Sequence, residues 1–256
     1  MLTSQFCRAR RAAYGKGAAH RFGWLSLVLI ALASAATSRA SLVLEGTALS
    51  NGGGIGTSSV ILTIQNTGTE QGCVGWNGSI DIVGSAACPV GLTPSIIGGD
   101  EKSGNSQVQT LTIAQTGVLS AASLVVILNV NEPGGGSFTV NNVSLTIYGA
   151  TTGQILFNSG NLTNPTTISD SFQGQGNPGF AFMLDATEAA EAQAFWSNPL
   201  NRVGIAGLLS QTAGSNETFS VADGSVVNIT PLPEPSGILL SLAGLAGIAL
   251  LRRRKS

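Results

Sequence analysis

The sequence predicts an all-β protein, an antiparallel β-sandwich or jelly roll with one short helix, between an N-terminal signal helix and a C-terminal transmembrane helix. From Ser41 onward, short apolar runs return roughly every 10 to 20 residues, with Gly, Asn, Asp and Ser between them. The runs are rich in β-branched residues, which strands favour. The 256 residues are 43% apolar and 10% charged and include 34 glycines, which argues against a coiled coil or a charged disordered chain.

Seven apolar runs are candidate strands: Leu42–Leu44, Val60–Ile64, Leu111–Ile113, Leu124–Val130, Ile155–Phe157, Phe180–Leu184 and Val226–Ile229. The clearest alternation is in Phe138–Val140 and Val143–Tyr148. There Val143, Leu145 and Ile147 share one face, so we expect that face to be buried and the other to be solvated.

Three glycine-containing segments are candidate connections between strands. They are Asn51–Gly54, Pro133–Gly136 and Asp223–Gly224. Glycine adopts positive φ angles at no steric cost, so we expect tight turns there.

One segment has helix signals instead of strand signals. Asp185 stands at an N-cap position with Glu188 three residues later, and Asn198–Pro199 ends the run. We expect a short helix on the sheet edge. Its inward face would hold Ala186, Ala189, Ala190, Ala194 and Trp196, opposite Thr187, Glu188 and Glu191. An alternative is that Asp185, Glu188 and Glu191 form a carboxylate cluster for a cation.

Residues 1–40 are typical of a secretory signal peptide. Five basic residues precede the thirteen-residue apolar run 24–36, which is short for a helix that needs about 20 residues to span a bilayer. We predict cleavage between Ala40 and Ser41, with a site at Ala33–Ala35 and an uncleaved anchor as alternatives. Signal peptidase and the general secretion machinery are the implied partners.

The C-terminal segment 231–256 has three elements in order. Pro233, Glu234 and Pro235 form a motif that stops strands, and an uncharged apolar run extends from Gly237 to Leu251. Four bases follow at once: Arg252, Arg253, Arg254 and Lys255. The positive-inside rule then places the C-terminus in the cytoplasm and residues 41–230, the predicted exported domain, outside the inner membrane.

These last residues resemble the PEP-CTERM sorting signal of Gram-negative bacteria. The resemblance covers about 25 residues and implies that an exosortase, a membrane-embedded cysteine transpeptidase-like enzyme, reads the tail. It further implies processing near Pro233–Pro235, with Glu234 and the flanking prolines as recognition residues, and export connected with extracellular polysaccharide and biofilm. A permanent single-pass anchor without processing is the alternative.

The charge of the body excludes one class of partner. Between Ser41 and Pro231 there are two bases, Lys102 and Arg202, and twelve acids, which gives a net charge of −10. A chain so poor in bases has no electrostatic footprint for phosphate backbones. We therefore predict no nucleic-acid binding.

Cysteine and histidine usage limits the chemistry. Cys73 and Cys88 are the cysteines that remain after signal cleavage, and we expect them to form a disulfide in an oxidising compartment. The one histidine, His20, lies in the signal segment, so a triad or a histidine metal site is not available to the body. We predict no cofactor and no metal.

The predicted function is that of a non-enzymatic structural or adhesive protein of the extracellular polysaccharide matrix, at the cell surface or released from it. Two alternatives stay open. Trp76 and Tyr148 could form a stacking platform for sugar rings, as in a carbohydrate-binding module. A polysaccharide hydrolase would need only an Asp/Glu pair, and twelve acids are available.

Overall fold

The computed structural model describes residues 41–50, 58–104, 106–130, 136–169 and 179–231. The chain divides into two units, Met1–Arg39 and Ala40–Ser256, and all described residues belong to the second. The predicted signal peptide with Ala40, the turn at 51–54 and most of the turn at 133–136 lie outside them. So do the tail residues Pro233, Glu234, Pro235, Gly237, Leu251, Arg252, Arg253, Arg254 and Lys255.

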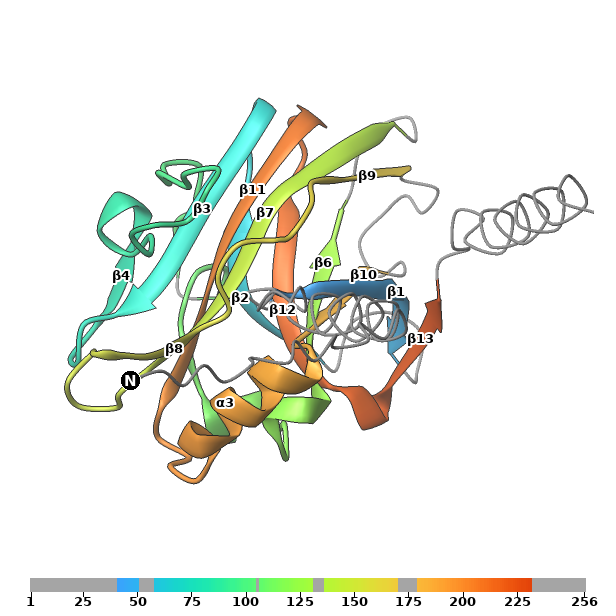
Figure 1. The fold of residues 1–256 in the computed structure, drawn as a ribbon. Coiled ribbons are helices and arrows are strands. Elements are labelled where there is room, and N and C mark those ends of the chain that lie inside the picture. Colours follow the sequence, from blue (N-terminus) through green and yellow to red (C-terminus); the bar gives the residue numbers. More distant parts are fainter. Residues whose placement is uncertain (1–40, 51–57, 105, 131–135, 170–178, 232–256) are drawn as a thin grey trace, which may run out of the picture. The chain divides into compact units, whose positions relative to one another are not determined.

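The described residues form two antiparallel sheets, as Figure 1 shows. The first has the strand order β13 (Val227–Pro231), β1 (Val43–Ser50), β10 (Gly179–Met183), β6 (Leu124–Asn129), β12 (Glu217–Asp223) and β2 (Ser59–Ile64). The second has the order β4 (Asp81–Val83), β3 (Thr67–Trp76), β11 (Arg202–Ala213), β7 (Ser137–Tyr148) and β8 (Ile155–Asn158), with β5 (Leu111–Thr112) beside β11 and β9 (Thr166–Ser169) beside β7. The predicted all-β class is confirmed.

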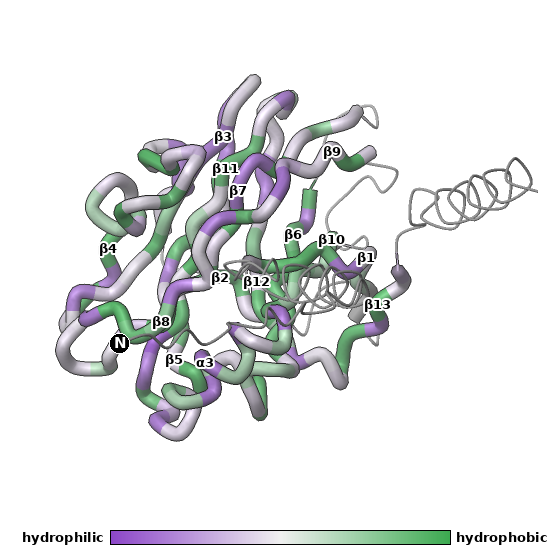
Figure 2. Tube along the Cα trace, viewed as in Figure 1, coloured by the Kyte–Doolittle hydropathy of each residue, from purple (hydrophilic) through white to green (hydrophobic). Residues whose placement is uncertain are grey.

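The main core lies between the two sheets. Its largest fully buried side chains are Phe138 of β7, Phe182 of β10 and Phe219 of β12, so both sheets contribute aromatic rings to one interior. Strand β6 is buried at all six positions, and Figure 2 shows hydrophobic colour along it. This arrangement is that of a sandwich, in which apolar burial between sheets supplies most of the stabilisation.

Strand β7 differs from its expected pattern. The two predicted runs form one continuous strand of twelve residues, and the register against β11 shifts between Leu208 and Leu209. Both faces are buried: Ser144 is fully buried like Leu145. The prediction of a solvated face was wrong because Ala206, which pairs with Ser144, lies under a second apolar cluster formed by the loop after β4.

The helix at 186–196 is present, but its faces are rotated from those expected. Helix α3 (Ala186–Trp196) begins at Asp185, whose carboxylate accepts hydrogen bonds from Thr187 N and Glu188 N. Its buried residues are Glu188, Ala189, Ala192 and Trp196, while Ala186, Ala190 and Ala194 are exposed. The Trp196 indole donates to Val118 O at 3.1 Å, and this buried contact fixes the rotation of the helix.

The described chain holds a second helix, which the sequence pattern hid inside a predicted strand. Strand β5 ends at Thr112, whose hydroxyl accepts from Gln115 N while Gln115 Oε1 accepts from Thr112 N. This reciprocal capping box starts helix α2 (Ile113–Thr116) at the residue where the strand was expected to end.

The remaining short elements are three 3₁₀ turns, η1 (Gly84–Ala86), η2 (Ala121–Ser123) and η3 (Gly224–Val226). The predicted turn at Asp223–Gly224 is η3, and Gly224 does not take a positive φ there. The Asp223 carboxylate accepts from Ser225 N at 2.8 Å, and this side-chain cap makes the turn. No helix among the described residues is long and apolar enough to span a membrane.

Candidate functional site

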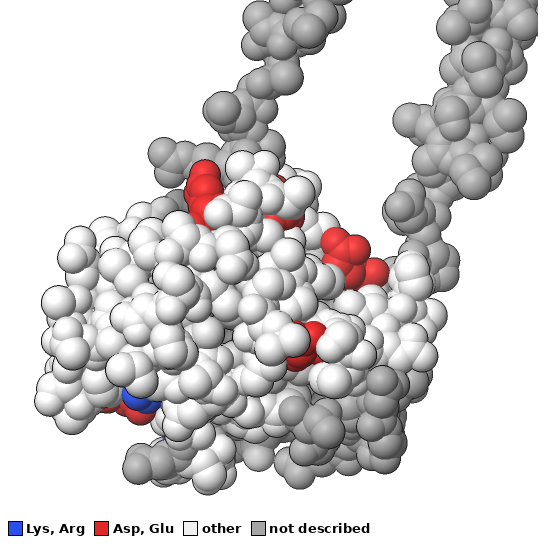
Figure 3. Space-filling view, turned by 90° about the horizontal axis from the view of Figure 1, so that it is seen from below, with Lys and Arg blue, Asp and Glu red and all other residues white. Residues whose placement is uncertain are grey.

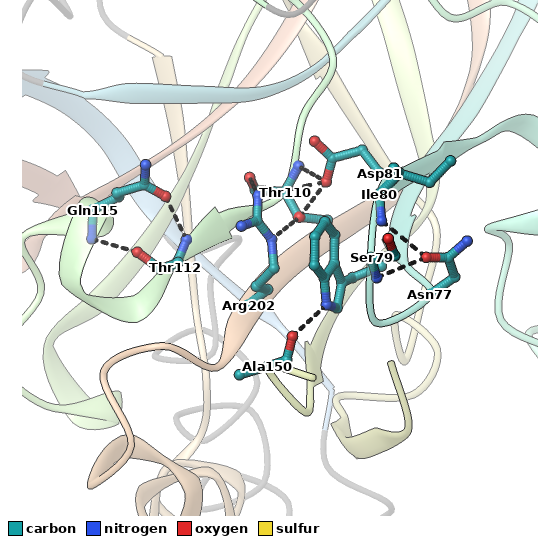
Figure 4. Close-up of polar contacts among 10 residues, drawn as sticks. Asn77, Ser79, Ile80, Asp81, Thr110, Thr112, Gln115, Ala150 and Arg202 are labelled. Carbon is teal, nitrogen blue, oxygen red and sulfur yellow. Dashed lines mark hydrogen bonds and ion pairs between the residues drawn. The ribbon is translucent and has the colours of Figure 1, made fainter. Parts of the chain in front are cut away.

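The end of strand β3 carries the sugar-stacking candidate Trp76. Its partner strand β4 follows after a hairpin in which Asn77 Oδ1 accepts from Ser79 N at 2.9 Å and from Ile80 N at 3.0 Å. This Asx-type turn places Trp76 opposite Asp81. The indole Nε1 donates to Ala150 O at 2.8 Å, so the ring is held in one orientation (Figure 4).

Arg202, one of the two bases in the body, lies over this ring. Its guanidinium carbon is 4.1 Å from the centroid of the Trp76 ring, a cation–π contact. Its Nε donates to Thr110 Oγ1 at 2.6 Å and its Nη2 to Thr110 O at 2.7 Å. One face of the indole is therefore covered by a guanidinium that is itself fixed by two hydrogen bonds.

Asp81 completes the group. Its Oδ1 lies 3.6 Å from Arg202 Nη2, and it also accepts from Thr110 N at 3.0 Å and from the Thr110 hydroxyl. Figure 4 shows these contacts converging on Thr110 from β4 and β11. The charge of Asp81 is balanced by hydrogen-bond donors and by Arg202, so the group presents no unmatched charge to a ligand. The same contacts hold four segments of the second sheet together.

Tyr148, the other ring of the predicted platform, is buried, with 4% of its surface exposed. A Cβ on Gly75 would lie 2.7 Å from the Tyr148 hydroxyl, and one on Gly204 would lie 3.0 Å from its ring. The ring thus lies across two glycines in the neighbouring strands, and burial raises the pKa of its hydroxyl. Trp76 and Tyr148 do not form an exposed stacking surface, which corrects the binding-module expectation at those residues.

Two carboxyl groups do come together, but inside the molecule: burial raises the pKa of Glu70, and a side-chain hydrogen bond with Glu217 opposes that rise. Glu70 of β3 and Glu217 of β12 are each 0% exposed. A glycosidase carboxylate pair must contact its sugar, and a polysaccharide does not reach side chains at this depth. Sequence reasoning did not single out these two residues, because their strands were not recognised.

The expected cluster Asp185, Glu188 and Glu191 is divided by the rotation of α3. Glu188 is 4% exposed, whereas Glu191, about one helical turn further on, is exposed. Burial raises the pKa of Glu188 to about 8, with further contributions from the charges of Asp185 and Glu191 and an opposing hydrogen bond from the Asp185 backbone. Within the described ranges, no group of three or more His, Cys, Asp or Glu side chains could hold a metal ion.

The predicted disulfide between Cys73 and Cys88 is confirmed, with Cα atoms 5.1 Å apart. It fastens the loop after β4 to the outer face of β3. The same loop contributes Ala87, Leu92 and Ile96 to a small apolar cluster with Ala206 and Leu208. The disulfide and this apolar cluster together hold the loop against the sheet, as expected for a cross-link in a glycine-rich region.

This loop also encloses a hollow of about 250 Å³, which the sequence did not indicate. Cys88, Pro89, Leu92 and Ile96 line it, together with the exposed side chains of Val90 and Ile97. The lining atoms are mostly apolar and include the side chains of Ser85 and Ser95 but no ionisable side chain, so the hollow offers mainly shape and apolar contact.

Figure 3 shows one face of the described body with few, separated charged groups. The predicted sorting residues Pro233, Glu234 and Pro235 lie outside the described residues, so the resemblance of the tail rests on its sequence. Comparison with protein-family models, with curated proteins and with solved structures gives no match to the chain.

Proposed function

We propose that this chain is an exported, non-enzymatic surface protein with a structural or adhesive role in the extracellular polysaccharide matrix. A signal peptidase would remove residues 1–40, and an exosortase would read the C-terminal tail at the inner membrane. The observation that carries the proposal is the ordered tail: Pro233–Pro235, the apolar run 237–251, and the bases 252–255 at the C-terminus.

The body supports export through its cysteines. Cys73 and Cys88 are joined, and disulfides form and persist in oxidising compartments such as the periplasm and the cell exterior. In the chain-entropy model, closing a loop of about 15 residues contributes on the order of 3 kcal/mol. The cross-link therefore adds stability where chaperones of the cytoplasm do not act.

The surface chemistry supports contact with neutral polymers. The described body has two bases, Lys102 and Arg202, and both are already bound to neighbouring side chains. Exposed Thr and Gln side chains hydrogen-bond across β7, β9 and β11, as in Thr139 Oγ1 to Thr167 Oγ1 at 2.9 Å. Uncharged donors and acceptors of this kind suit the hydroxyl groups of a polysaccharide better than they suit a charged polymer.

The end of the described body supports access of an enzyme to the tail. Strand β13 is at the edge of its sheet and ends at the exposed residue Pro231, two positions before Pro233. The motif therefore follows directly from a sheet edge.

The test is replacement of Pro233, Glu234 and Pro235 by alanine in the producing cell, with Ser236→Ala as the matched control. Intact-mass measurement of the surface fraction should give a chain shortened at both ends for the wild type and for Ser236→Ala. The triple variant should accumulate in the inner membrane with its tail attached, and cell aggregation should fall as in a deletion strain.

Two outcomes contradict the proposal. One is a full-length wild-type chain in the cytosol with its leader intact. The other is a deletion strain with an unchanged matrix and unchanged aggregation, which would leave the sorting step but remove the structural or adhesive role.

A further inference from the structure

Glu70 and Glu217 lie where the two sheets meet at one end of the sandwich. Glu70 is on β3 and pairs with Leu209 near the end of β11. Glu217 is the first residue of β12, opposite Ile64 of β2. Both side chains are 0% exposed, so each acid has left water completely. A carboxylate buried in this way is costly unless donors or positive charge surround it.

The donors near Glu70 are used elsewhere. The Thr212 hydroxyl donates to Asn66 O at 3.4 Å, and Gln65 Nε2 donates to Gly214 O at 2.8 Å. The Ser215 hydroxyl donates to Glu217 Oε1 at 3.1 Å. As a result neither carboxyl oxygen of Glu70 receives a hydrogen bond from a described residue when both acids are ionised.

The charged groups on the surrounding segments do not neutralise the pair. Asp100 accepts from Asn66 Nδ2 at 2.8 Å and Gln71 N at 2.9 Å, and Glu101 accepts from Cys73 N at 2.8 Å. Lys102 is the cation of this region, and its Nζ donates to Gln65 Oε1. The other charged residues of β11 and β12 are Arg202, which is paired with Asp81 at the start of β11, and Asp223, at the far end of β12. The local field is therefore negative.

The titration of Glu70 agrees with this geometry. Burial raises the pKa of Glu70 above its ordinary value, and the negative charge of Asp100 raises it further. Hydrogen bonding, chiefly with the Glu217 carboxyl, opposes the shift. A hydrogen bond between two carboxyl groups requires that one of them keeps its proton.

We propose that Glu70 and Glu217 share one proton, the Glu70 carboxylic acid donating to the Glu217 carboxylate, and that this acid pair is a pH-sensitive fastener between the two sheets. While the proton is present, β3 of one sheet is bonded to β12 of the other. When it is lost, two adjacent buried carboxylates repel each other, and this end of the sandwich opens.

The sign of the pH dependence follows from linkage. In the unfolded chain both acids ionise near pH 4.5, whereas the folded chain keeps the shared proton above that pH. Stability is therefore greatest at acidic pH and falls as pH rises from the unfolded pKa to the folded one. Beyond the folded pKa the full repulsion is present.

The experiment compares the full-length wild-type chain with Glu70→Gln from pH 5 to pH 10. The glutamine amide donates to Glu217 as the protonated acid does, but it does not titrate. Amide hydrogen exchange, corrected for the intrinsic pH dependence, should show at least about tenfold faster opening of the β11–β12 connection at high pH in the wild type and no such rise in Glu70→Gln. Glu191→Gln, at an exposed site, should behave as the wild type.

A second measurement does not depend on the folding of that variant. Glu188→Gln removes the acid of α3 whose pKa burial also raises. In this variant the infrared spectrum of the folded chain at pH 7 should contain the carbonyl band of a protonated carboxylic acid. Alkaline pH should remove that band. Absence of that band, or equal pH dependence of exchange in wild type and Glu70→Gln, overturns the proposal. So does protection of this connection by calcium that EDTA reverses, because a bound cation would then replace the proton.

Discussion

Asp223 and Glu188 are two buried carboxyl groups on either side of the turn η2, and their pKa values move in opposite directions. Asp223 is 7% exposed and Glu188 is 4% exposed, so their burial is nearly equal. Burial raises the pKa of both, yet hydrogen bonds lower that of Asp223 to about 2 while that of Glu188 rises to about 8. The comparison teaches that the local supply of donors, together with depth, decides whether a buried acid stabilises this fold.

The supply differs because the backbone differs. Asp223 precedes a turn and accepts from Leu119 N at 3.0 Å, Ser123 Oγ at 2.9 Å and Ser225 N at 2.8 Å. Glu188 lies in the first helical turn, where Asp185 already takes the free amides of Thr187 and Glu188. A carboxylate at Glu188 thus meets two negative neighbours and few donors.

The largest expected effect comes from removing the negative charge of Asp223, which accepts several hydrogen bonds. Asp223→Asn places an amide N–H where the carboxylate accepted from Leu119 N and Ser123 Oγ, so we expect a loss of about 3 kcal/mol in the free energy of unfolding at pH 7. The contribution of Asp223 is present above the unfolded pKa and is lost as pH falls toward about 2. Urea unfolding at pH 7 and pH 2 measures both values.

The pH dependence is the decisive part of that test. The difference between Asp223→Asn and wild type should shrink at pH 2, where the wild-type carboxyl begins to take up a proton. A difference that stays constant from pH 7 to pH 2 would mean that shape, and not charge, makes Asp223 important. Glu191→Gln serves as the exposed control and should change stability by less than about 0.5 kcal/mol.

A smaller effect of opposite sign is expected at Glu188, which has few hydrogen-bond donors around it. Glu188→Gln removes a group that must stay protonated or pay desolvation, so we expect a gain of about 2 kcal/mol at pH 8. The folded pKa is raised, so wild-type stability is complete below about pH 4.5 and decreases as pH rises toward about 8. Thermal melts across this range should show a slope in the wild type that Glu188→Gln lacks.

The same experiment has a clear contrary result. If Glu188→Gln destabilises the chain equally at pH 4.5 and pH 8, the side chain is held by specific contacts that the amide disturbs. Asp185→Ala is the matched control on the same turn: it should weaken the helix cap at both pH values, because the Asp185 carboxylate accepts the two first-turn amides.

Much of the fold could be predicted from local sequence. Strands β2, β6, β8 and β10 coincide closely with apolar runs, and Asp185 caps α3 as expected. The disulfide was predictable because the body has two cysteines. In each case a short stretch of sequence contains the whole physical signal.

The central strands β3 and β11 could not be predicted from local sequence, because their glycines make room for side chains that are distant in the sequence. Gly207 of β11 leaves space for Phe219, whose ring atom would be 2.6 Å from a Cβ there. Gly75 of β3 and Gly204 of β11 lie under Tyr148. Glycine lowers the apparent strand propensity of a sequence, although here it permits the tight packing of a ring on a sheet.

The candidate sites were hidden for the same reason. The contact of Arg202 with Trp76 requires that the start of β11 lies beside the end of β3, and β11 was not recognised. The inward rotation of Glu188 depends on the distant partner of Trp196, the carbonyl of Val118. The proposed sorting residues, such as Glu234, could be predicted without such a partner, because a linear motif is recognised from its sequence.

The smallest expected effect is at Arg202, whose charged group has several hydrogen-bond and ring contacts but is partly exposed to solvent. Arg202→Lys keeps the positive charge near Asp81 but loses the planar group stacked on Trp76 and the two hydrogen bonds to Thr110. Because Arg202 is 19% exposed and Asp81 29% exposed, solvent screens the ion pair, and we expect a loss of about 1 kcal/mol. Salt should change this difference little, since stacking and neutral hydrogen bonds account for most of it. Trp76 fluorescence should also respond to the loss of the guanidinium.

A difference above about 3 kcal/mol that disappears in high salt would instead assign Arg202 to the group of charges, like Asp223, on which the fold depends electrostatically.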